Sequence, residues 1–572
     1  MIKENERLNV LNHSCAHLLA HAVKNLYPEA LFWVGPVIEE GFYYDIDLKD
    51  NSITEEDLIN IEREMKRISK DNKKIIKLEL TKEEALEIFK NDSYKLELIK
   101  DLENITAYKQ DNFIDLCKGP HVEFTKEIKY FKLLKVSGAY FKNDSKNKML
   151  QRIYGICFET EEDLNKHLEF LEEAKKRDHK RLGKELDLFM FSEYGPGFPF
   201  WLPKGMILYR ILEDFWYKEH TKEGYKFIKT PIMLNKDLWE ISGHYSNYKE
   251  NMYISNVEEK EFAIKPMNCP GGMLVYKNNL YSYKDLPLKI AELGHVHRHE
   301  SSGALNGLLR VRAFTQDDAH IFMTENQIES EIVSLIKFID RIYKVFNLSY
   351  KIELSTRPEE NFIGDIKIWD KAEEALKNAL IKSGNDYKIN VGDGAFYGPK
   401  LDFKLKDSIG RTWQCGTIQL DMQLPERFDL TYIDKDGSKK RPIMIHRVIY
   451  GSLDRFIGVL IEHFAGAFPL WLSPVQVNII PVNNEYHLEY CNKIKNLLIE
   501  NNIRVELDDR DEKLSYKMRE SQMNKNPYTL IIGDKEKENN FISYRKYNSN
   551  ETEFISISDF ESLLISEIKD KR

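Results

Sequence analysis

Residues 295–322 read HVHRHESSGALNGLLRVRAFTQDDAHIF. Arg298, Arg310 and Arg312 flank a turn made of small residues, and a strand-like run, VRAFTQDDAHIF, follows the turn. A guanidinium presents a rigid fork of N–H donors that matches two phosphate oxygens, so the pattern indicates a phosphate-binding hairpin. An exposed hairpin that binds nothing is the alternative.

The segments around this hairpin predict a sheet covered by helices. A helix is expected near 326–346, where apolar residues recur at helical spacing, and TWQCGTIQLDM (412–422) is expected to be a strand. Strands and helices here lack a regular βαβ rhythm, which favours largely antiparallel pairing. In HRVIYGSLDRFIGVLIEHF (446–464) a strand enters a helix, and Arg455 lies near the positive helix N-terminus, which favours an anion.

Length and composition indicate a cytoplasmic protein with several domains, each with its own hydrophobic core. The chain has 572 residues, 42% of them hydrophobic, and a net charge of −9, which argues against indiscriminate coating of nucleic acid. The charged start MIKENERLNV carries no secretory signal. The most apolar stretch is interrupted by Glu462 and His463, so no membrane span is expected, and six cysteines do not suggest a disulfide framework.

Changes of pattern predict four parts. Residues 1–170 form a first α+β unit, and 171–187 a basic linker helix that continues the leucine spacing of 164–182. Residues 188–472 hold the mixed sheet, and 473–572 have a strand–helix–strand rhythm that predicts a small α/β domain with parallel strands.

The first unit opens with HSCAHLLAHAV (13–23), in which His13, His17 and His21 are four residues apart. On a helix this spacing places all three imidazoles on one face. A metal site, an acid/base site and a polar stripe on a buried helix all remain open from the spacing alone.

Several strings together resemble threonyl-tRNA synthetase, a class II aminoacyl-tRNA synthetase. The hairpin and residues 446–464 resemble motifs 2 and 3 of that class, and PGFPFWLPKG with FIKTPIM, which contains Pro231, resembles motif 1. The strings particular to the threonyl group are KPMNCPG (265–271), RVRAFTQDDAHIF (310–322), FYGPKLDF (396–403), TWQCGTIQLDM and HRVIYGSLDRFIG (446–458).

The resemblance implies an α+β multidomain protein that joins L-threonine to tRNA(Thr) with ATP and Mg²⁺. Its catalytic core would be an antiparallel sheet with helices, followed by an α/β anticodon-binding domain. Arg298 would bind the α-phosphate of ATP, and Arg455 the other end of the bent nucleotide. Motif 1 would form a homodimer interface, and the basic run 175–184 would face RNA or serve as a structural linker.

The resemblance also implies one Zn²⁺ per chain, bound by Cys269, His320 and His446. A thiolate and two imidazoles suit Zn²⁺ and leave positions for substrate. Threonine's amino and hydroxyl groups can both coordinate the metal, whereas valine lacks the hydroxyl and is rejected. The residues expected to contact substrate are Gln316 and Asp318 on its amino side, with Tyr397, Gln414 and Arg310.

Serine lacks only a methyl, worth roughly 1–3 kcal/mol, so a second hydrolytic site is expected. HSCAH (13–17) together with DLCKGPH (115–121) resembles the editing domain shared with alanyl-tRNA synthetases. Its pocket would hold His13, His17, Cys117 and His121, with Asp115 and Lys95 close by. His21 is expected either to pack in the core or to support the pocket residues from outside the pocket, and the pocket is expected to work without tightly bound metal.

The chain departs from the family pattern in several places. The resemblance leads us to expect that the sequence starts at the second domain of many bacterial members, without their ubiquitin-like domain. The substituted positions are Gly272, Asn306, Ala313, Lys118 and Phe141. None removes a residue that the mechanism requires.

Two other functions are weighed against this one. A seryl- or prolyl-type synthetase conflicts with the Cys/His/His set and the TQDDAH context. A non-catalytic, RNA-binding regulator would be expected to lose Arg298 and Arg455, which are present. His244, in SGHYSNYKENMY, is predicted to help deprotonate the tRNA hydroxyl, with a packing role as the alternative.

Overall fold

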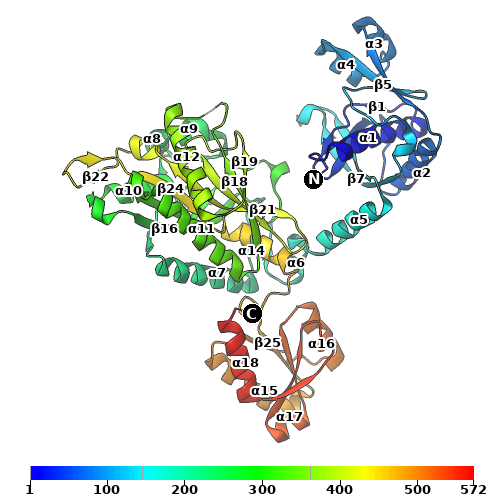
Figure 1. The fold of residues 1–572 in the computed structure, drawn as a ribbon. Helices are drawn as coiled ribbons and strands as arrows, with labels where there is room; N and C mark the ends of the chain where they lie inside the picture. The colour runs from blue at the N-terminus through cyan, green and yellow to red at the C-terminus, as the bar shows by residue number, and fades with distance from the viewer. Residues whose placement is uncertain (1, 145, 361, 572) are drawn as a thin grey trace. The chain divides into compact units, whose positions relative to one another are not determined.

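The computed structural model describes residues 2–144, 146–360 and 362–571. The chain divides into two compact units, Met1–Glu172 and Glu173–Arg572 (Figure 1). Among the described residues, no helix has both the length and the apolar character needed to cross a membrane.

The N-terminal unit packs helix α1 (Glu6–Leu26) against an antiparallel sheet. Asn5 caps α1 because its side chain accepts the N–H of Leu8, and the apolar face of the helix is buried in the core of the unit. The strands of this sheet are β1 (Leu31–Phe32), β2 (Val37–Ile38), β3 (Gly41–Asp47), β7 (Tyr130–Tyr140) and β8 (Met149–Phe158). Helix α2 (Asp57–Lys70) packs beside α1.

A smaller sheet in the same unit carries the second half of the histidine–cysteine cluster. Its strands are β4 (Ile75–Leu80), β5 (Ile105–Gln110) and β6 (Phe113–Leu116), with helices α3 (Lys82–Ile88) and α4 (Ser93–Lys100) packed nearby. Strand β6 leads directly into the segment that holds Cys117 and His121.

The prediction of a single linker helix is wrong, because two helices occupy this segment. Helix α5 (Glu161–Lys176) ends before Arg177, and α6 (His179–Glu185) begins after Asp178. The Asp178 backbone is not helical, and its carboxylate accepts the N–H groups of Lys180 and Arg181. An aspartate in this position starts a new helix.

The second unit is built on an eight-stranded sheet. In spatial order its strands are β11 (Lys226–Phe227), β16 (Leu288–His297), β17 (Ala313–Met323), β24 (Ile443–Val448), β21 (Thr412–Asp421), β20 (Lys400–Lys406), β18 (Ser349–Ser355) and β19 (Tyr387–Asn390). The five inner pairings are antiparallel, as predicted, and the two outermost pairings are parallel.

Helices cover the apolar face of this sheet. They are α7 (Pro203–Lys222), α11 (Ile328–Val345), α12 (Ile366–Ser383) and α14 (Leu453–His463). Because side chains alternate along a strand, Ile321 of β17 and Ile445 of β24 face this core, while His320 and His446 face the other side. Helix α10 (Cys269–Lys277) lies over that other side, in a second cluster with Phe322 and Met444.

Smaller elements complete this part of the chain. They are β9 (Phe189–Met190), β10 (Phe200–Trp201), β12 (Met233–Asn235), β13 (Tyr253–Val257), β14 (Lys260–Ile264), α8 (Lys236–Ser242), α9 (His244–Asn247), β15 (Tyr281–Ser282), β22 (Tyr432–Ile433), β23 (Lys439–Lys440) and α13 (Leu424–Arg427).

The C-terminal segment is a five-stranded α/β domain with its own apolar core. Strands β26 (Val505–Leu507), β25 (Val477–Pro481) and β27 (Tyr528–Ile532) are parallel, as predicted. Strands β28 (Phe541–Lys546) and β29 (Glu553–Ser556) extend the sheet in antiparallel pairing, which the sequence did not predict. The helices are α15 (Asn484–Glu500), α16 (Leu514–Met523), α17 (Asp534–Asn539) and α18 (Ile557–Lys569).

Candidate functional site

Three residues distant in sequence meet on the polar face of the large sheet. His320 and His446 are directly opposite on β17 and β24, with ring centroids 5.1 Å apart. Cys269 begins helix α10, and one ligand atom from each of the three residues lies within 4.8 Å of the others. Gln419 continues the row because it pairs with His446 from strand β21.

The polar atoms of this cluster are arranged as a cation site requires. Burial raises the pKa of the Cys269 thiol well above its usual value and lowers the pKa of His320 to about 4. The Nε2 atom of His320 is buried without a hydrogen-bond partner in the described structure. A bound cation would supply that missing partner and stabilise the thiolate, so the sulfur and two imidazoles fit a zinc ion.

The departure at Gly272 leaves room beside this set. A Cβ atom at position 272 would lie 3.3 Å from His320 Nδ1, which is a tight contact. The glycine therefore leaves the His320 ring unconstrained on that side.

Substrate-binding residues predicted from sequence surround the cluster. The rings of Tyr397 and His446 are 5.1 Å apart, and burial raises the pKa of Tyr397 well above its usual value. Asp318 Oδ1 lies 3.8 Å from His320 Nε2. Asn268 Nδ2 donates to Asp318 Oδ2 at 3.1 Å and to Gln316 Oε1 at 3.4 Å.

Sequence reasoning missed Asn268 and Gln419 as site residues. Both lie inside strings that carried the resemblance, KPMNCPG and TWQCGTIQLDM. Gln419 is buried, and its amide donates to the carbonyl of Gly398 at 3.2 Å.

A cavity of about 460 Å³ is lined by Gln316, whose side chain also contacts Asn268. Five of the predicted residues line it, namely Arg298, Arg310, Gln316, Gln414 and Arg455. Arg298 donates through Nε to the Pro266 carbonyl at 3.1 Å, and its guanidinium lies 5.2 Å from the Phe314 ring centroid. These contacts anchor the arginine at Nε and leave both Nη atoms available for an anion.

Arg455 is held by backbone carbonyls. Its Nε donates to Leu309 O and its Nη1 to Gln414 O, both at 3.0 Å. Arg310 is more exposed and donates to Glu300 Oε2 at 3.0 Å.

The Gln414 side chain is fixed within the sheet. Its Nε2 donates to Asp402 Oδ1 at 2.7 Å, and its Oε1 accepts from Lys404 Nζ at 3.2 Å. Gln414 thus lines the cavity with an amide whose orientation is set by its neighbours.

His244 is fully buried at the start of α9 and is not a lining residue of the cavity. Its Nδ1 lies 2.8 Å from Ser242 Oγ and its Nε2 3.0 Å from Met267 Sδ. Burial lowers the pKa of His244 to about 3, with smaller contributions from His446 and Arg298.

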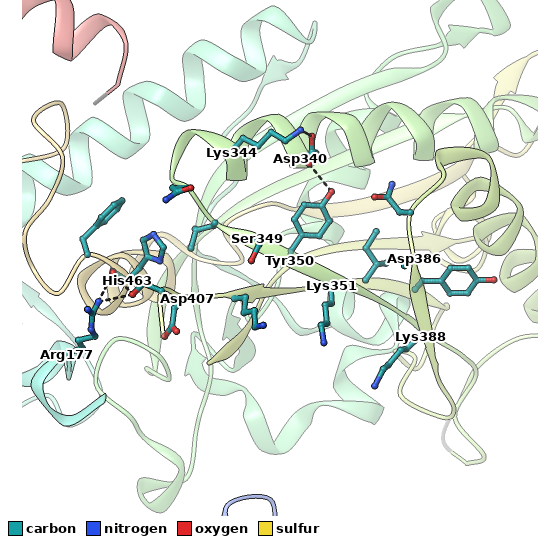
Figure 2. Close-up of a pocket in the computed structure, with 18 residues that line it drawn as sticks. Arg177, Asp340, Lys344, Ser349, Tyr350, Lys351, Asp386, Lys388, Asp407 and His463 are labelled. Atoms are coloured by element: carbon teal, nitrogen blue, oxygen red, sulfur yellow. Dashed lines mark hydrogen bonds and ion pairs between the residues drawn. The ribbon is translucent and has the colours of Figure 1, made fainter. Parts of the chain in front are cut away.

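A larger hollow lies elsewhere on this unit (Figure 2). Its volume is about 1340 Å³. It is lined by residues of the outer strands, among them Tyr350, Lys351 and Lys388, and by Arg177 and His463. None of the predicted site residues lines it.

The second predicted cluster is assembled within the N-terminal unit. His13 and His17 project from α1, and Cys117 Sγ lies 3.2 Å from His13 Nε2 and 3.1 Å from His121 Nε2. The ligand atoms of all four lie within 4.8 Å of one another. Ser14 contributes a contact that the sequence did not predict, since its Oγ lies 3.1 Å from His121 Nδ1.

A buried charge network supports this cluster. Lys95 Nζ lies 2.5 Å from Asp115 Oδ1, and His17 Nδ1 lies 3.1 Å from Asp115 Oδ2. The Tyr44 hydroxyl donates to the same carboxylate, a contact that sequence reasoning missed. Burial lowers the pKa of His17 well below its usual value and raises that of Cys117 to about 12.

His21 lies on the same helix but takes no part in the cluster. Its ring nitrogens bind Asn112 Oδ1 and Gln110 Nε2, each at 2.9 Å, and the ring stacks on Phe113. This is the packing role, one of the two expected for it.

Family models match three segments of the chain. Residues 251–464 match the "tRNA synthetase class II core domain (G, H, P, S and T)", and residues 476–567 match the "Anticodon binding domain". Residues 105–154 match the "Threonyl and Alanyl tRNA synthetase second additional domain". The first two segments lie on the eight-stranded sheet and the C-terminal domain, and the third contains Cys117 and His121.

Full-length similarity extends across these segments. The threonine–tRNA ligase of Acetivibrio thermocellus is 57% identical over 564 residues, covering 98% of this chain and 88% of the relative. That of Fusobacterium nucleatum is 57% identical over 567 residues, covering 98% and 91%.

Structural similarity agrees with these relatives. A crystal structure of the RNA binding domain of threonyl-tRNA synthetase from Cryptosporidium parvum is 43% identical, with a TM-score of 0.66, and covers 68% of this chain and 98% of that one. The predicted α+β fold class is therefore confirmed, and the chain belongs to the threonine–tRNA ligase family of class II aminoacyl-tRNA synthetases.

Proposed function

We propose that the chain joins L-threonine to tRNA(Thr) through a threonyl-adenylate. The observation that carries this proposal is the arrangement of Gln316, Asp318 and His320 along β17. Alternate residues of a strand share a face, so these three side chains run over about 13 Å from the arginine-lined cavity to the Cys/His/His set. This arrangement supports an amino-acid site beside a nucleotide site.

The first step joins the amino acid to ATP. The threonine carboxylate attacks the α-phosphorus, and Mg²⁺-bound pyrophosphate leaves. Arg298 and Arg455 stabilise the charge that develops on the phosphate oxygens, because their free N–H groups face the cavity and their Nε atoms are already anchored. Arg310 at the cavity wall adds a more mobile positive charge.

Threonine is recognised at the Cys269, His320 and His446 set, which would hold one Zn²⁺. Bound there, Zn²⁺ supplies open coordination positions for the amino and hydroxyl groups of threonine. Asp318 and Gln316, held by Asn268, accept hydrogen bonds from the amino group, and Tyr397 closes the pocket beside His446.

The second step transfers threonine to the tRNA. A hydroxyl of the terminal ribose attacks the carbonyl carbon of the threonyl-adenylate. The bond between that carbon and the bridging oxygen breaks, and AMP leaves with the oxygen. His244 accepts the hydroxyl proton at Nε2 once that atom leaves its contact with Met267. The depressed pKa of His244 keeps the imidazole neutral, but the same burial makes it a weak base that can hold the proton only transiently.

The N-terminal cluster hydrolyses seryl-tRNA(Thr). Burial lowers the pKa of His13, His17 and His121, so the three neutral rings can orient a water and pass its proton on, although none holds that proton as a stable imidazolium. Lys95 and Asp115 hold His17 in place. Seryl ester and water become serine and free tRNA without any other reactant.

We assign one function to each of the four predicted parts of the chain. We assign editing to 1–170, the linker to 171–187, synthesis to 188–472 and anticodon reading to 473–572. A homodimer forms through motif 1, whose apolar side chains are exposed at Phe200, Met206, Phe227, Ile232 and Met233. The chain works in the cytoplasm, where its six unpaired cysteines remain reduced.

ATP–pyrophosphate exchange with a panel of amino acids tests the proposal. Exchange that depends on threonine supports it, and preference for serine or proline would assign another specificity. Absence of exchange with every amino acid would favour the alternative of a non-catalytic RNA-binding regulator.

A further inference from the structure

The segment Arg177–Lys180, which joins α5 to α6 and includes the first two residues of α6, contacts two parts of the catalytic centre. We call it the clamp segment. One part is the C-terminal end of α14, the helix that carries Arg455 near its N-terminus. The other is the motif 2 loop, residues 298–312 between β16 and β17.

Arg177 binds the end of α14. Its Nη1 donates to the His463 carbonyl at 3.0 Å (Figure 2). The same nitrogen donates to the Glu462 carbonyl at 3.4 Å and to Ser408 Oγ at 2.8 Å. The last carbonyls of a helix lack partners within the helix and carry partial negative charge. Arg177 therefore supplies hydrogen-bond donors to the carbonyl groups at the C-terminal end of α14.

His179 connects the end of α14 to the motif 2 loop. Its side chain is buried, its Nδ1 lies 2.7 Å from Glu462 Oε1, and its Nε2 accepts the backbone N–H of Leu308 at 3.0 Å. An imidazole that accepts at Nε2 carries its proton at Nδ1, so His179 is a neutral ring that donates to the Glu462 carboxylate. Each ring nitrogen of His179 is thus hydrogen-bonded to a different element: Nδ1 to α14 and Nε2 to the motif 2 loop.

The motif 2 loop is shaped to pass over this imidazole. Gly307 has φ +51°, and a Cβ atom there would lie 2.2 Å from His179 Nε2. Lys180 Nζ donates to Asn306 Oδ1 at 3.2 Å, one residue earlier in the loop. The family departure at Asn306 is therefore a direct partner of the clamp segment.

The contact at Leu308 adjoins the nucleotide cavity. Leu308, Leu309 and Arg310 line that cavity, and the Leu309 carbonyl accepts the Nε–H of Arg455 at 3.0 Å. A displacement of Leu308 would move the next carbonyl and with it the anchor of Arg455. The path from His179 to Arg455 thus consists of two hydrogen bonds and the backbone of two residues, Leu308 and Leu309.

We propose that His179 is a positioning residue for the nucleotide site, which it serves by fixing the motif 2 loop at Leu308. This rests on the proposed adenylation activity. The function requires the Nε2 acceptor, whereas the Nδ1 donor orients the ring on Glu462.

Two substitutions separate these two contacts. In His179→Gln, the amide oxygen can take the place of Nε2 and accept from Leu308. In His179→Asn, the shorter amide reaches only the place of Nδ1, so the bond to Glu462 can remain while the Leu308 N–H loses its partner. We expect His179→Asn to lower kcat/KM for ATP in threonine-dependent pyrophosphate exchange by about tenfold, mainly through KM, and His179→Gln to stay within about threefold of the parent.

His487→Asn is the matched control. His487 is also buried, accepts the N–H of Asn483 at 3.1 Å and lies 3.0 Å from Asp534 Oδ1, but it belongs to the C-terminal domain. Exchange kinetics in this variant should equal those of the parent, and thermal unfolding should be measured for all three variants.

Equal losses in the Asn and Gln variants, or parent-like ATP kinetics in His179→Asn, would overturn the proposal. A loss that appears only in kcat and follows a lowered unfolding temperature would also overturn it, because a merely structural role has that signature. A parent chain without threonine-dependent exchange would instead refute the proposed function.

Discussion

Asp421 fixes the tautomer of His446. Its Oδ2 lies 2.8 Å from His446 Nε2, and its Oδ1 accepts the backbone N–H groups of Gln423 and Leu424. The carboxylate can only accept, so the imidazole carries its proton at Nε2 and leaves Nδ1 as a lone-pair donor. A carboxylate behind a metal-binding histidine orients the ring and strengthens the ligand.

Asp421→Asn should reverse this tautomer. The amide oxygen would keep the bonds to Gln423 and Leu424, so the NH₂ group would face His446 Nε2 and force its proton to Nδ1. We expect zinc affinity to fall by about 10–100-fold, measured by competition with a chromogenic chelator. Asp429→Asn, an exposed position in the same domain, serves as the control, and unchanged affinity in Asp421→Asn would contradict the assignment.

Removing a proposed zinc ligand should remove the ion. Cys269→Ser, His320→Ala and His446→Ala should each lose about one equivalent of zinc per chain, because three protein ligands are the usual minimum for such a site. Threonine activation should disappear with the metal. Elemental analysis of the purified variants measures the zinc content per chain. Full zinc content in all three variants would show that the proposed ligand set is wrong.

Arg298→Ala and Arg455→Ala should lower the rate of adenylate formation by about 10²–10³-fold. Each substitution removes charge-assisted donors from the cavity that we propose holds the reacting phosphate. Arg441→Ala is the control, since Arg441 pairs with Asp429 away from the cavity. Single-turnover adenylation measures the step directly, and retention of the parental rate in both variants would reject the proposed roles.

The sequence predicted elements with strong local patterns but not all of their boundaries. The amphipathic spacing of 326–346 predicted α11, and the strand-like run VRAFTQDDAHIF (311–322) predicted β17, because each signal is contained almost entirely within one element. The leucine spacing of 164–182 predicted one helix, although two occur. A break of two residues hardly disturbs such spacing, and Asp178 was the signal that could have revealed it.

The site residues could not be found from spacing. His320 faces His446 because β17 and β24 pair in one register, and that register is set by turns and packing over the long intervening chain. Only the resemblance brought Cys269 into the same prediction. Tyr44, Asn268 and Asp421 were missed for the same reason, since each acts through a residue distant in sequence.

Hydrolysis of seryl-tRNA(Thr) should be insensitive to histidine protonation near neutral pH. Burial lowers the pKa of His13, His17 and His121, so the neutral form persists to a lower pH than for a free imidazole. The rate constant should therefore show no loss of activity between about pH 8 and pH 6.5, the ordinary pKa of histidine. A rate that falls by half near pH 6.5 would indicate a titrating histidine and contradict these environments.

The double change His13→Ala with His17→Ala should separate editing from synthesis. Both side chains belong to the N-terminal cluster, where His13 contacts Cys117 and His17 contacts Asp115. The variant should charge threonine at nearly the parental rate and accumulate seryl-tRNA(Thr), which the parent is expected to hydrolyse. His21→Gln is the control on the same helix face, and it should edit normally because His21 binds Asn112 and Gln110 outside the cluster.

The same variant tests whether the editing pocket needs a metal. Two histidines, a cysteine and a third histidine are an acceptable ligand set for zinc, and their ligand atoms lie close enough to share one ion. However, burial raises the pKa of Cys117 to about 12, so in the absence of a cation the sulfur stays a thiol, and neutral imidazoles suffice for general base catalysis. We therefore expect about one zinc per chain in the parent and in the variant alike. Two zinc ions in the parent, with one lost on substitution, would show that the pocket is a metal site, whereas undiminished hydrolysis of seryl-tRNA(Thr) would leave the histidines with a structural role only.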